Sequence, residues 1–233
     1  MNEEIRDLQR QIDAMDAPAM LALLLERYAE RIALASSFGA EDQVLTDMLC
    51  GISSKARIFT LDTGRLPAET YDAIEATRKK YGVTITLLFP DYHQVEEMVR
   101  VSGPNLFYES VANRKRCCQI RKIEPLHRQL ANLDVWVAGL RKEQSVTRQE
   151  VQRITWDEAN GIIKVCPLAG WTTEQVWDYI RRHDVPYNKL HDQGYPSIGC
   201  GPCTRAVKEG QDIRAGRWWW EAPEHKECGL HLK

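Results

Sequence analysis

The sequence has no long apolar run and no excess of one charge. No stretch approaches the roughly 20 apolar residues that span a bilayer, and the start, MNEEIRDLQR, lacks the apolar region of a signal peptide. The 31 basic and 33 acidic side chains nearly cancel, to a formal net charge of -2. Such a balance gives no global field that attracts nucleic acid or a membrane. We therefore expect a cytoplasmic protein without a nucleic-acid or membrane partner, in which any electrostatic function is local.

Internal repeats, low-complexity stretches and Gly/Ser linkers are also absent, as are the GxGxxG and GxxxxGK(S/T) patterns of common phosphate-binding loops. A chain of 233 residues with 43% hydrophobic content can bury one substantial core, so we expect a single domain over 1–233. Seven cysteines form an odd set. In a reducing compartment they are read as metal ligands, reactive thiols and core residues rather than a disulfide framework.

Short apolar runs alternate with helical patterns through the first two thirds of the chain. The pattern predicts strands over 32–36, 57–61, 83–89 and 135–140, and helices over 3–15, 17–30, 40–49, 67–81, 92–101 and 120–131. This alternation predicts an α/β fold with a mostly parallel, twisted sheet and helices on both faces. A hairpin over 153–156 and 162–165 and a helix over 173–183 follow. The last 45 residues are irregular and rich in Gly, Pro and Trp, which favours a ligand or metal that orders them.

Three loops at the carboxyl ends of the predicted strands carry anion-binding chemistry, and in open parallel sheets ligands bind at this edge. Residues 36–42 supply the hydroxyls of Ser36 and Ser37 between a strand and a helix, although a serine N-cap is an equally ordinary interpretation. Residues 61–65 supply Asp62, Thr63 and Arg65 as hydrogen-bond partners. The third loop supplies two arginines, Arg141 and Arg148. Together these loops favour an anionic nucleotide over three solvated turns.

Four cysteines indicate a metal centre. Cys200 and Cys203 form a CxxC turn, which is common to zinc, iron-sulfur and redox sites. Cys117 and Cys118 are adjacent, and adjacent thiolates diverge on a regular backbone, which suits separate corners of a cluster better than one zinc ion. Five cations within residues 114–122 stabilise thiolates. A structural zinc site and a basic surface with incidental thiols remain the alternatives.

The remaining conspicuous residues support simpler interpretations. Cys228 is a single thiol near the C terminus, beside Gly229 and close to His231, and alone it is typical of an incidental cysteine. Cys50 and Cys166 have apolar neighbours and are predicted to be core residues. The three tryptophans over 218–220 are expected to clamp the irregular segment onto the core rather than to stack on a base.

The motifs taken together resemble the thioredoxin-dependent adenylylsulfate reductases, the cluster-bearing branch of the sulfonucleotide reductase family. The resemblance covers nearly the whole chain and follows the family's order. The matching motifs are SSFGAED (36–42), LDTGR (61–65), KRCCQIRK (115–122), GLRKEQSVTR (139–148), GCGPCTR (199–205), RAGRWWW (214–220) and ECGLHL (227–232).

The resemblance implies a fold like the adenine-nucleotide α-hydrolases, a mobile C-terminal tail over 221–233 and a 4Fe-4S cluster. It implies that the cluster ligands are Cys117, Cys118, Cys200 and Cys203, and that Cys228 is the catalytic nucleophile. The phosphosulfate end of the substrate would be held by Lys122, Arg214, Arg217 and His231. The nucleotide would be held by Ser36, Ser37, Asp62, Thr63 and Arg65, with Arg141 and Arg148 as further anion contacts.

The implied reaction is the reduction of adenosine 5'-phosphosulfate (APS) to sulfite and AMP through an S-sulfocysteine on Cys228, in assimilatory sulfate reduction and cysteine biosynthesis. Thioredoxin or glutaredoxin would be the reductant. The rival substrate is the 3'-phosphorylated nucleotide (PAPS). A nucleic-acid-binding zinc module and an ATP pyrophosphatase are the alternatives from other classes; Phe38 and Ala40 at small or hydroxyl positions of the first loop disfavour the latter. Whether the chain forms a homo-oligomer is left open.

Overall fold

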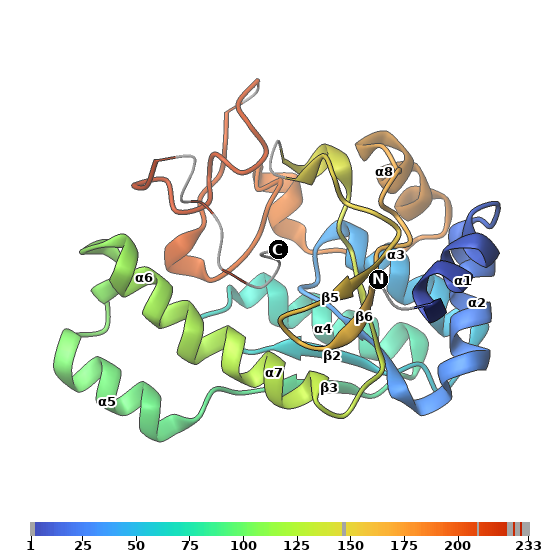
Figure 1. The fold of residues 1–233 in the computed structure, drawn as a ribbon. Coiled ribbons are helices and arrows are strands. Elements are labelled where there is room, and N and C mark those ends of the chain that lie inside the picture. Colours follow the sequence, from blue (N-terminus) through green and yellow to red (C-terminus); the bar gives the residue numbers. More distant parts are fainter. Residues whose placement is uncertain (1–2, 146–147, 209, 223–225, 227–228, 230–233) are drawn as a thin grey trace.

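The computed structural model describes residues 3–145, 148–208, 210–222, 226 and 229 (Figure 1). Its centre is a six-stranded sheet with the order β3-β2-β1-β4-β6-β5. The strands are β1 Ile32–Ala35, β2 Ile58–Leu61, β3 Ile85–Leu88, β4 Val135–Ala138, β5 Ile154–Asp157 and β6 Ile162–Val165. All neighbouring pairs are parallel except β5 and β6, which pair antiparallel at the edge. The predicted mostly parallel sheet and the predicted hairpin are therefore confirmed.

Eight α-helices accompany the sheet within the described residues. They are α1 Glu3–Ile12, α2 Ala17–Tyr28, α3 Ala40–Ile52, α4 Ala68–Tyr81, α5 Tyr92–Ser102, α6 Val111–Cys118, α7 Glu124–Leu130 and α8 Thr173–Arg182. The sequence predicts all of them except α6, whose residues VANRKRCC carry too few apolar side chains for a helical period. Ser110 begins this helix, because its side chain accepts the Asn113 N–H.

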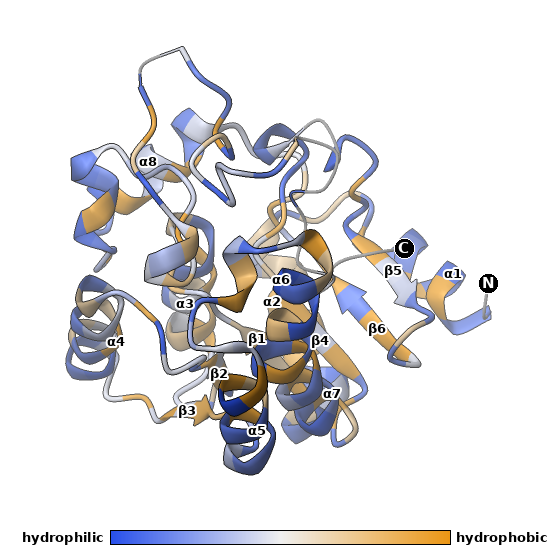
Figure 2. Ribbon diagram, turned by 90° about the vertical axis from the view of Figure 1, so that its left-hand side faces the viewer, coloured by the Kyte–Doolittle hydropathy of each residue, from blue (hydrophilic) through white to orange (hydrophobic). Residues whose placement is uncertain are grey.

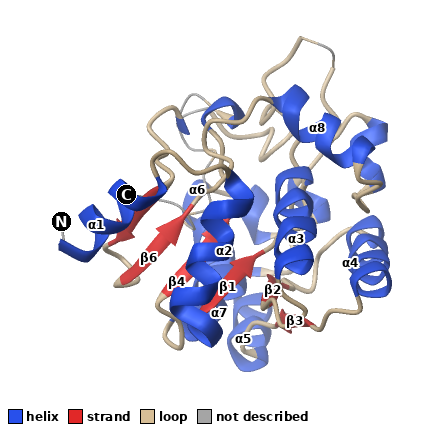
Figure 3. Cartoon of the chain, turned by 90° about the vertical axis from the view of Figure 1, so that its right-hand side faces the viewer, coloured by secondary structure: helices blue, strands red, loops and turns tan. Residues whose placement is uncertain are grey.

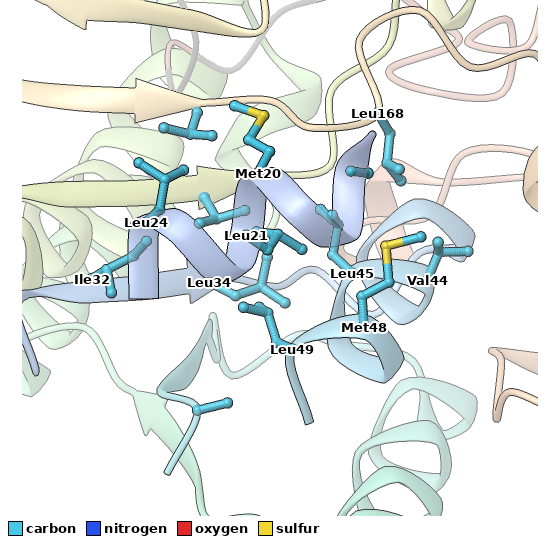
Figure 4. Packing of buried hydrophobic residues seen from close by; sticks show 14 of the residues in the cluster. Met20, Leu21, Leu24, Ile32, Leu34, Val44, Leu45, Met48, Leu49 and Leu168 are labelled. Carbon is cyan, nitrogen blue, oxygen red and sulfur yellow. The ribbon is translucent and has the colours of Figure 1, made fainter. Parts of the chain in front are cut away.

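The two faces of the sheet bury different clusters of apolar side chains, because successive residues of a strand point to opposite faces. Leu34, Val135 and Val137 lie in one cluster with residues of α1, α2 and α3, part of which Figure 4 shows. Trp136 and Ala138 lie in the other, which includes residues of α7. Figure 3 shows α2 and α3 on one side of the sheet and α7 on the other. The helices on both faces therefore agree with the prediction.

Hydrophobic residues concentrate on the strands, whereas α4 and α5 turn strongly hydrophilic faces outward (Figure 2). Within the described part of the chain, no helix combines the length and the apolar character that crossing a membrane requires. Among its described residues, the segment after residue 190 has only short 3-10 turns as helical structure, and it lies beside α6 (Figure 1) and next to the loops that follow β1, β2 and β4. This placement brings the irregular C-terminal region to the loops that carry the anion-binding motifs.

Candidate active site and cysteine pocket

A cleft of about 920 Å³ opens at the carboxyl edge of the sheet. The loops after β1, β2 and β4 all contribute to it, as the sequence predicts, and residues beyond 190 close the opposite side. The candidate site residues that line it are Ser36, Ser37, Thr63, Lys122, Arg141, Arg148, Arg214 and Arg217. Cys200 lines it as well, so the cleft touches the predicted metal centre.

Hydrogen bonds to Asp42, a residue that the sequence analysis did not single out, fix the loop after β1. Its Oδ2 accepts the Ser37 N–H at 2.6 Å and the Ser37 hydroxyl at 2.7 Å. Burial raises the pKa of Asp42 to about 6, against the opposing effect of the hydrogen bonds from Ser37. Gly139 must be glycine here, because a Cβ would lie 2.2 Å from Oδ1 of Asp42. Asp42 therefore fixes the loops after β1 and β4 against each other.

Phe38 does not occupy the cleft. Its backbone is left-handed, with φ of 59°, and its ring is fully buried with Ala73 and Ile74 of α4. The N–H of Phe38 donates to the Ser36 hydroxyl oxygen at 3.1 Å. The bulky side chain therefore points into the core, and the cleft wall consists of the small residues around it.

The loop after β2 joins the cleft to the cysteines. The Thr63 hydroxyl lies 3.2 Å from Sγ of Cys200, and the Thr63 carbonyl accepts from Arg121 at 2.6 Å. Asp62 is buried and accepts from the Tyr71 hydroxyl at 3.0 Å. Arg65 donates to the Pro104 carbonyl and stacks over Phe107. Asp62 and Arg65 thus have protein partners, and among the described residues neither is part of the cleft lining, so their contact with a nucleotide stays a prediction.

The loop after β4 places its two arginines differently. Arg141 is buried, and its guanidinium donates to Glu41 at 2.7 and 2.9 Å. That pairing compensates the charge of Arg141 within the protein. Arg148 also lines the cleft and donates to the Gln144 side chain at 2.6 Å.

Arg217 is the cation most clearly built into the cleft. It is 6% exposed, and its Nη1 donates to the Ile198 carbonyl at 3.2 Å. Its buried Nε has no hydrogen-bond partner among the described residues. Gly199 makes room for it, because a Cβ there would lie 2.3 Å from Nη2. Gly199, the first glycine of the GCGPC motif, is therefore needed to leave space for the Arg217 side chain, which the sequence alone does not show.

The four predicted ligand cysteines share one small pocket beside the cleft. Cys117, Cys118, Cys200 and Cys203 are all buried, none of the four is in a disulfide, and all line this pocket. Four cations line the same pocket: Arg65, Arg114, Arg121 and Lys122. No three His, Cys, Asp or Glu side chains within the described ranges are grouped so that they would hold a single metal ion.

The helix that carries the cysteine pair changes its winding directly after it. A π-helical segment over Gln119–Ile123 joins α6 to α7, and π segments are frequent at functional sites. This segment carries Arg121 and Lys122, so the cations emerge one turn after the thiols.

Electrostatics differ among the thiols. Burial raises the pKa of Cys203 to about 12, and the neighbouring Cys200 adds to this effect. Burial also opposes ionisation of Cys200, but Lys122, the Thr63 hydroxyl and Arg217 lower the pKa of that thiol below its ordinary value. The pocket therefore favours negative charge at the cysteine closest to the cleft.

Two functional predictions fall outside the described residues, namely Cys228 and His231. The same is true of most of the predicted tail over 221–233. Trp218 is described and is buried, and it lines both the cleft and the cysteine pocket. It clamps the C-terminal segment onto the core, as the sequence predicts. His191 also lines the cleft, and burial lowers its pKa.

Comparison with known sequences places this arrangement in a family. Residues 31–206 match the family model described as the phosphoadenosine phosphosulfate reductase domain. The adenosine 5'-phosphosulfate reductase of Allochromatium vinosum is 54% identical over 207 residues, which cover 89% of this chain and 81% of that protein. The enzyme of the same name from Burkholderia cepacia is 50% identical, over 97% of this chain and 89% of that protein.

Solved structures give the same fold. The phosphoadenylyl-sulfate reductase of Candida auris, in a phosphate complex, has a TM-score of 0.75 at 26% identity and covers 89% of this chain and 98% of its own. The FMN adenylyltransferase of Candida glabrata, in complex with FAD and pyrophosphate, has a TM-score of 0.56 at 15% identity, over 95% of this chain and 77% of its own. The second likeness concerns the fold alone, which is the predicted adenine-nucleotide α-hydrolase-like architecture.

Proposed function

The chain belongs to the phosphoadenosine phosphosulfate reductase family, on the side of its adenosine 5'-phosphosulfate reductases, and we propose that it reduces APS to sulfite and AMP. This is an oxidoreductase reaction on a sulfur group, in assimilatory sulfate reduction. The observation that carries the proposal is the cleft at the carboxyl edge of the sheet, where the motif residues converge around buried cations. Family membership also argues against a nucleic-acid-binding zinc module and an ATP pyrophosphatase.

Lys122, Arg214 and Arg217 would hold the phosphosulfate end. All three line the cleft, and Arg214 and Arg217 are buried, so their attraction for an anion is little screened by water. The Nε of Arg217, which has no partner in the described part of the chain, supports this role, because a buried donor without a partner costs free energy that a substrate oxygen would recover. These cations would also stabilise the charge that develops on AMP as it leaves.

Cys228 would be the nucleophile. Its thiolate attacks the sulfur of APS, a new S–S bond forms, and the bond between sulfur and the bridging phosphate oxygen breaks with both electrons leaving on AMP. A thiolate of a reduced dithiol protein, of the thioredoxin or glutaredoxin class, then attacks Sγ of Cys228 and releases sulfite. The second thiol of that protein resolves the mixed disulfide, so the dithiol supplies both electrons.

The cysteine pocket would hold a 4Fe-4S cluster. Its four buried cysteines, none of them in a disulfide, lie beside arginine and lysine side chains and match the ligand set and the charge of such a cluster. When bound, the cluster would supply a fixed charge centre that tunes the cleft electrostatically. The chain's own contribution is the Thr63 hydroxyl at Cys200 and the Lys122 side chain, which lines both the pocket and the cleft.

The second candidate substrate is PAPS, favoured by the likeness to the Candida auris phosphoadenylyl-sulfate reductase. Steady-state assays with reduced thioredoxin should give a kcat/KM for APS at least about 100-fold above that for PAPS, a difference of about 2.7 kcal/mol. A preference for PAPS would overturn the substrate assignment.

Replacing the nucleophile tests the covalent step. Cys228→Ser should abolish sulfite release, because a serine hydroxyl is far less nucleophilic than a thiolate, while the iron and sulfide content stays at the wild-type value. Cys50→Ser is the matched control, since Cys50 is a half-buried thiol outside both pockets, and it should keep its activity. Turnover by Cys228→Ser would refute covalent catalysis through this residue.

A further inference from the structure

Arg114 and Glu221 form an ion pair that is almost completely buried. Their side chains are 0% and 2% exposed. Nε of Arg114 donates to Oε1 of Glu221 at 2.9 Å, and Nη2 donates to Oε2 at 2.6 Å. The pair joins residues 107 positions apart in the chain. It therefore fastens α6 to the C-terminal segment with a fixed, two-pronged geometry.

Stability alone does not explain such a pair. Removing two charges from water costs about as much as their attraction returns, so well-packed apolar side chains at the same two positions stabilise a fold equally well or better. The ion pair differs from apolar side chains in its geometry, because a guanidinium and a carboxylate bind each other in one relative orientation. That orientation fixes the positions of groups on both sides of the pair.

On α6, the ion pair fixes the position of Cys117 and Cys118. Arg114 lies three and four residues before Cys117 and Cys118, so the three side chains share one face of α6. Arg114 also interacts with the Cys118 thiol, and it lines the cysteine pocket.

On the other side, the pair places a turn centred on Trp218. The N–H of Glu221 donates to the Trp218 carbonyl at 2.8 Å, and the N–H of Trp218 donates to the Cys203 carbonyl at 3.2 Å. Trp218 has φ of 39°, a left-handed conformation that a bulky residue adopts only when its surroundings impose it.

Three guanidinium groups surround the Trp218 ring. The Cζ atoms of Arg114, Arg214 and Arg217 lie 4.8, 5.9 and 4.7 Å from its centroid. Arg214 and Arg217 also line the cleft, whereas within the described residues Arg114 and Glu221 are not part of the cleft lining. The indole thus connects the buried pair to the two arginines on the substrate side.

We infer that Arg114 and Glu221 are positioning residues, which hold the Trp218 turn so that Arg214 and Arg217 reach the anionic end of the substrate while Cys203 stays beside Cys117 and Cys118. The inference rests on the proposed function and deepens it. Neither residue touches the reacting atoms. The pair sets the distance between the anion-binding cations and the cysteine pocket.

The test compares single and paired substitutions. Glu221→Gln leaves the Arg114 charge buried without its partner, and we expect a lower Tm and less iron per chain. The double variant Arg114→Met, Glu221→Met removes both charges, and we expect its Tm to return close to the wild-type value. Its KM for APS should nevertheless stay raised by about tenfold, and its iron content and visible spectrum should differ from wild type.

The controls separate positioning from folding. Glu97→Gln removes one partner of the exposed Arg100–Glu97 pair on α5 and should change none of these quantities. If the double variant does not fold, Glu221→Asp serves instead, because it keeps the charge and shortens the reach by one methylene; it should raise KM with a Tm near wild type.

The inference would be overturned if the double variant had the wild-type Tm, KM and iron content. The same result for Glu221→Asp would overturn it where the double variant does not fold. Wild-type protein that releases no sulfite from APS would instead refute the proposed function, so the two failures are distinguishable. Iron content gives a readout that does not depend on turnover.

Discussion

At the scale of single residues, Asp42 holds the loop after β1 in its conformation. Its carboxylate accepts both the N–H and the hydroxyl of Ser37, and its other oxygen fills the space that Gly139 leaves open. Protonation would replace one acceptor lone pair by a donor and weaken this arrangement. Burial raises the pKa of Asp42 to about 6, so the change falls within a pH range that an assay can reach.

We expect the KM of the wild-type protein for APS to rise as the pH falls below about 6, as Asp42 takes up its proton. Asp42→Asn should raise KM on the order of tenfold at neutral pH, because one end of the amide is a donor and cannot accept the Gly139 backbone N–H while the other end accepts from Ser37. It should also flatten the acid limb of the profile. A pH profile of kcat/KM measures both effects.

The sign of the stability effect follows from the same shift. The folded-state pKa of Asp42 lies above the ordinary aspartate value of 3.8, so its contribution to stability is fully present below pH 3.8 and is lost as the pH rises through about 6. Urea unfolding should therefore show Asp42→Asn gaining stability relative to wild type between these values. Asp47→Asn on the same helix is the control, since Asp47 accepts hydrogen bonds from Tyr81 and Tyr179 and not from the loop after β1. An unchanged KM in Asp42→Asn would contradict this role.

At the scale of elements, the π-helical segment over Gln119–Ile123 sets how the cysteine pair faces the cations that follow it. A π turn accommodates a residue more than an α turn, so it rotates Arg121 and Lys122 relative to Cys117 and Cys118. The segment places Lys122 where it lines both the cleft and the cysteine pocket.

Deleting Gln119 should let α6 and α7 run on as a regular helix and turn Lys122 away by about 100°. Because cations around a metal site support its ligands, we expect metal affinity to fall by roughly 10- to 100-fold, with helix content unchanged. Iron analysis and circular dichroism measure the two outcomes. Gln119→Ala keeps the chain length and should retain the iron. A deletion variant with full iron content would show that the winding is not needed.

At the scale of the whole molecule, binding at the cleft should stabilise the entire fold, because the loops of three strands and the C-terminal segment all line it. AMP, the product, at about 100 times its Kd should add about 2.7 kcal/mol to the free energy of unfolding. For a domain of this size that corresponds to a rise in Tm of about 5 to 10 °C.

Thermal unfolding with increasing AMP measures this rise. Adenosine is the matched control, because it lacks the phosphate that Arg214 and Arg217 would contact, and it should shift the Tm much less at equal concentration. Equal shifts with both ligands would argue that the cations of the cleft do not bind the phosphate end.

Much of the fold follows from local patterns in the sequence. The apolar runs that become β1, β2, β3 and β4 and the amphipathic stretches that become α1 to α5 are legible because burial imposes a period of 2 or 3.6 residues. The helix α6 could not be predicted in this way, since its buried side chains are Arg114, Cys117 and Cys118 rather than a periodic set of large apolar residues. Its stability comes from its cap and from packing against distant segments.

By itself the sequence determined the parallel sheet, the convergence of three loops at one edge and the residue types of the cysteine pocket, because each depends on short stretches of chain. Only the tertiary structure decided which side chains have hydrogen-bond or ion-pair partners within the protein. Arg65, Asp62 and Arg141, predicted as ligand contacts, have partners within the protein, and Phe38 points into the core.

Only the structure also revealed Asp42 beneath the loop and the buried link from Arg114 to Glu221. Asp42 packs against Gly139 of another loop, and Arg114 and Glu221 are 107 positions apart in the chain. Side-chain partners of this kind depend on how separate elements pack in space, and no pattern of spacing along one segment encodes that.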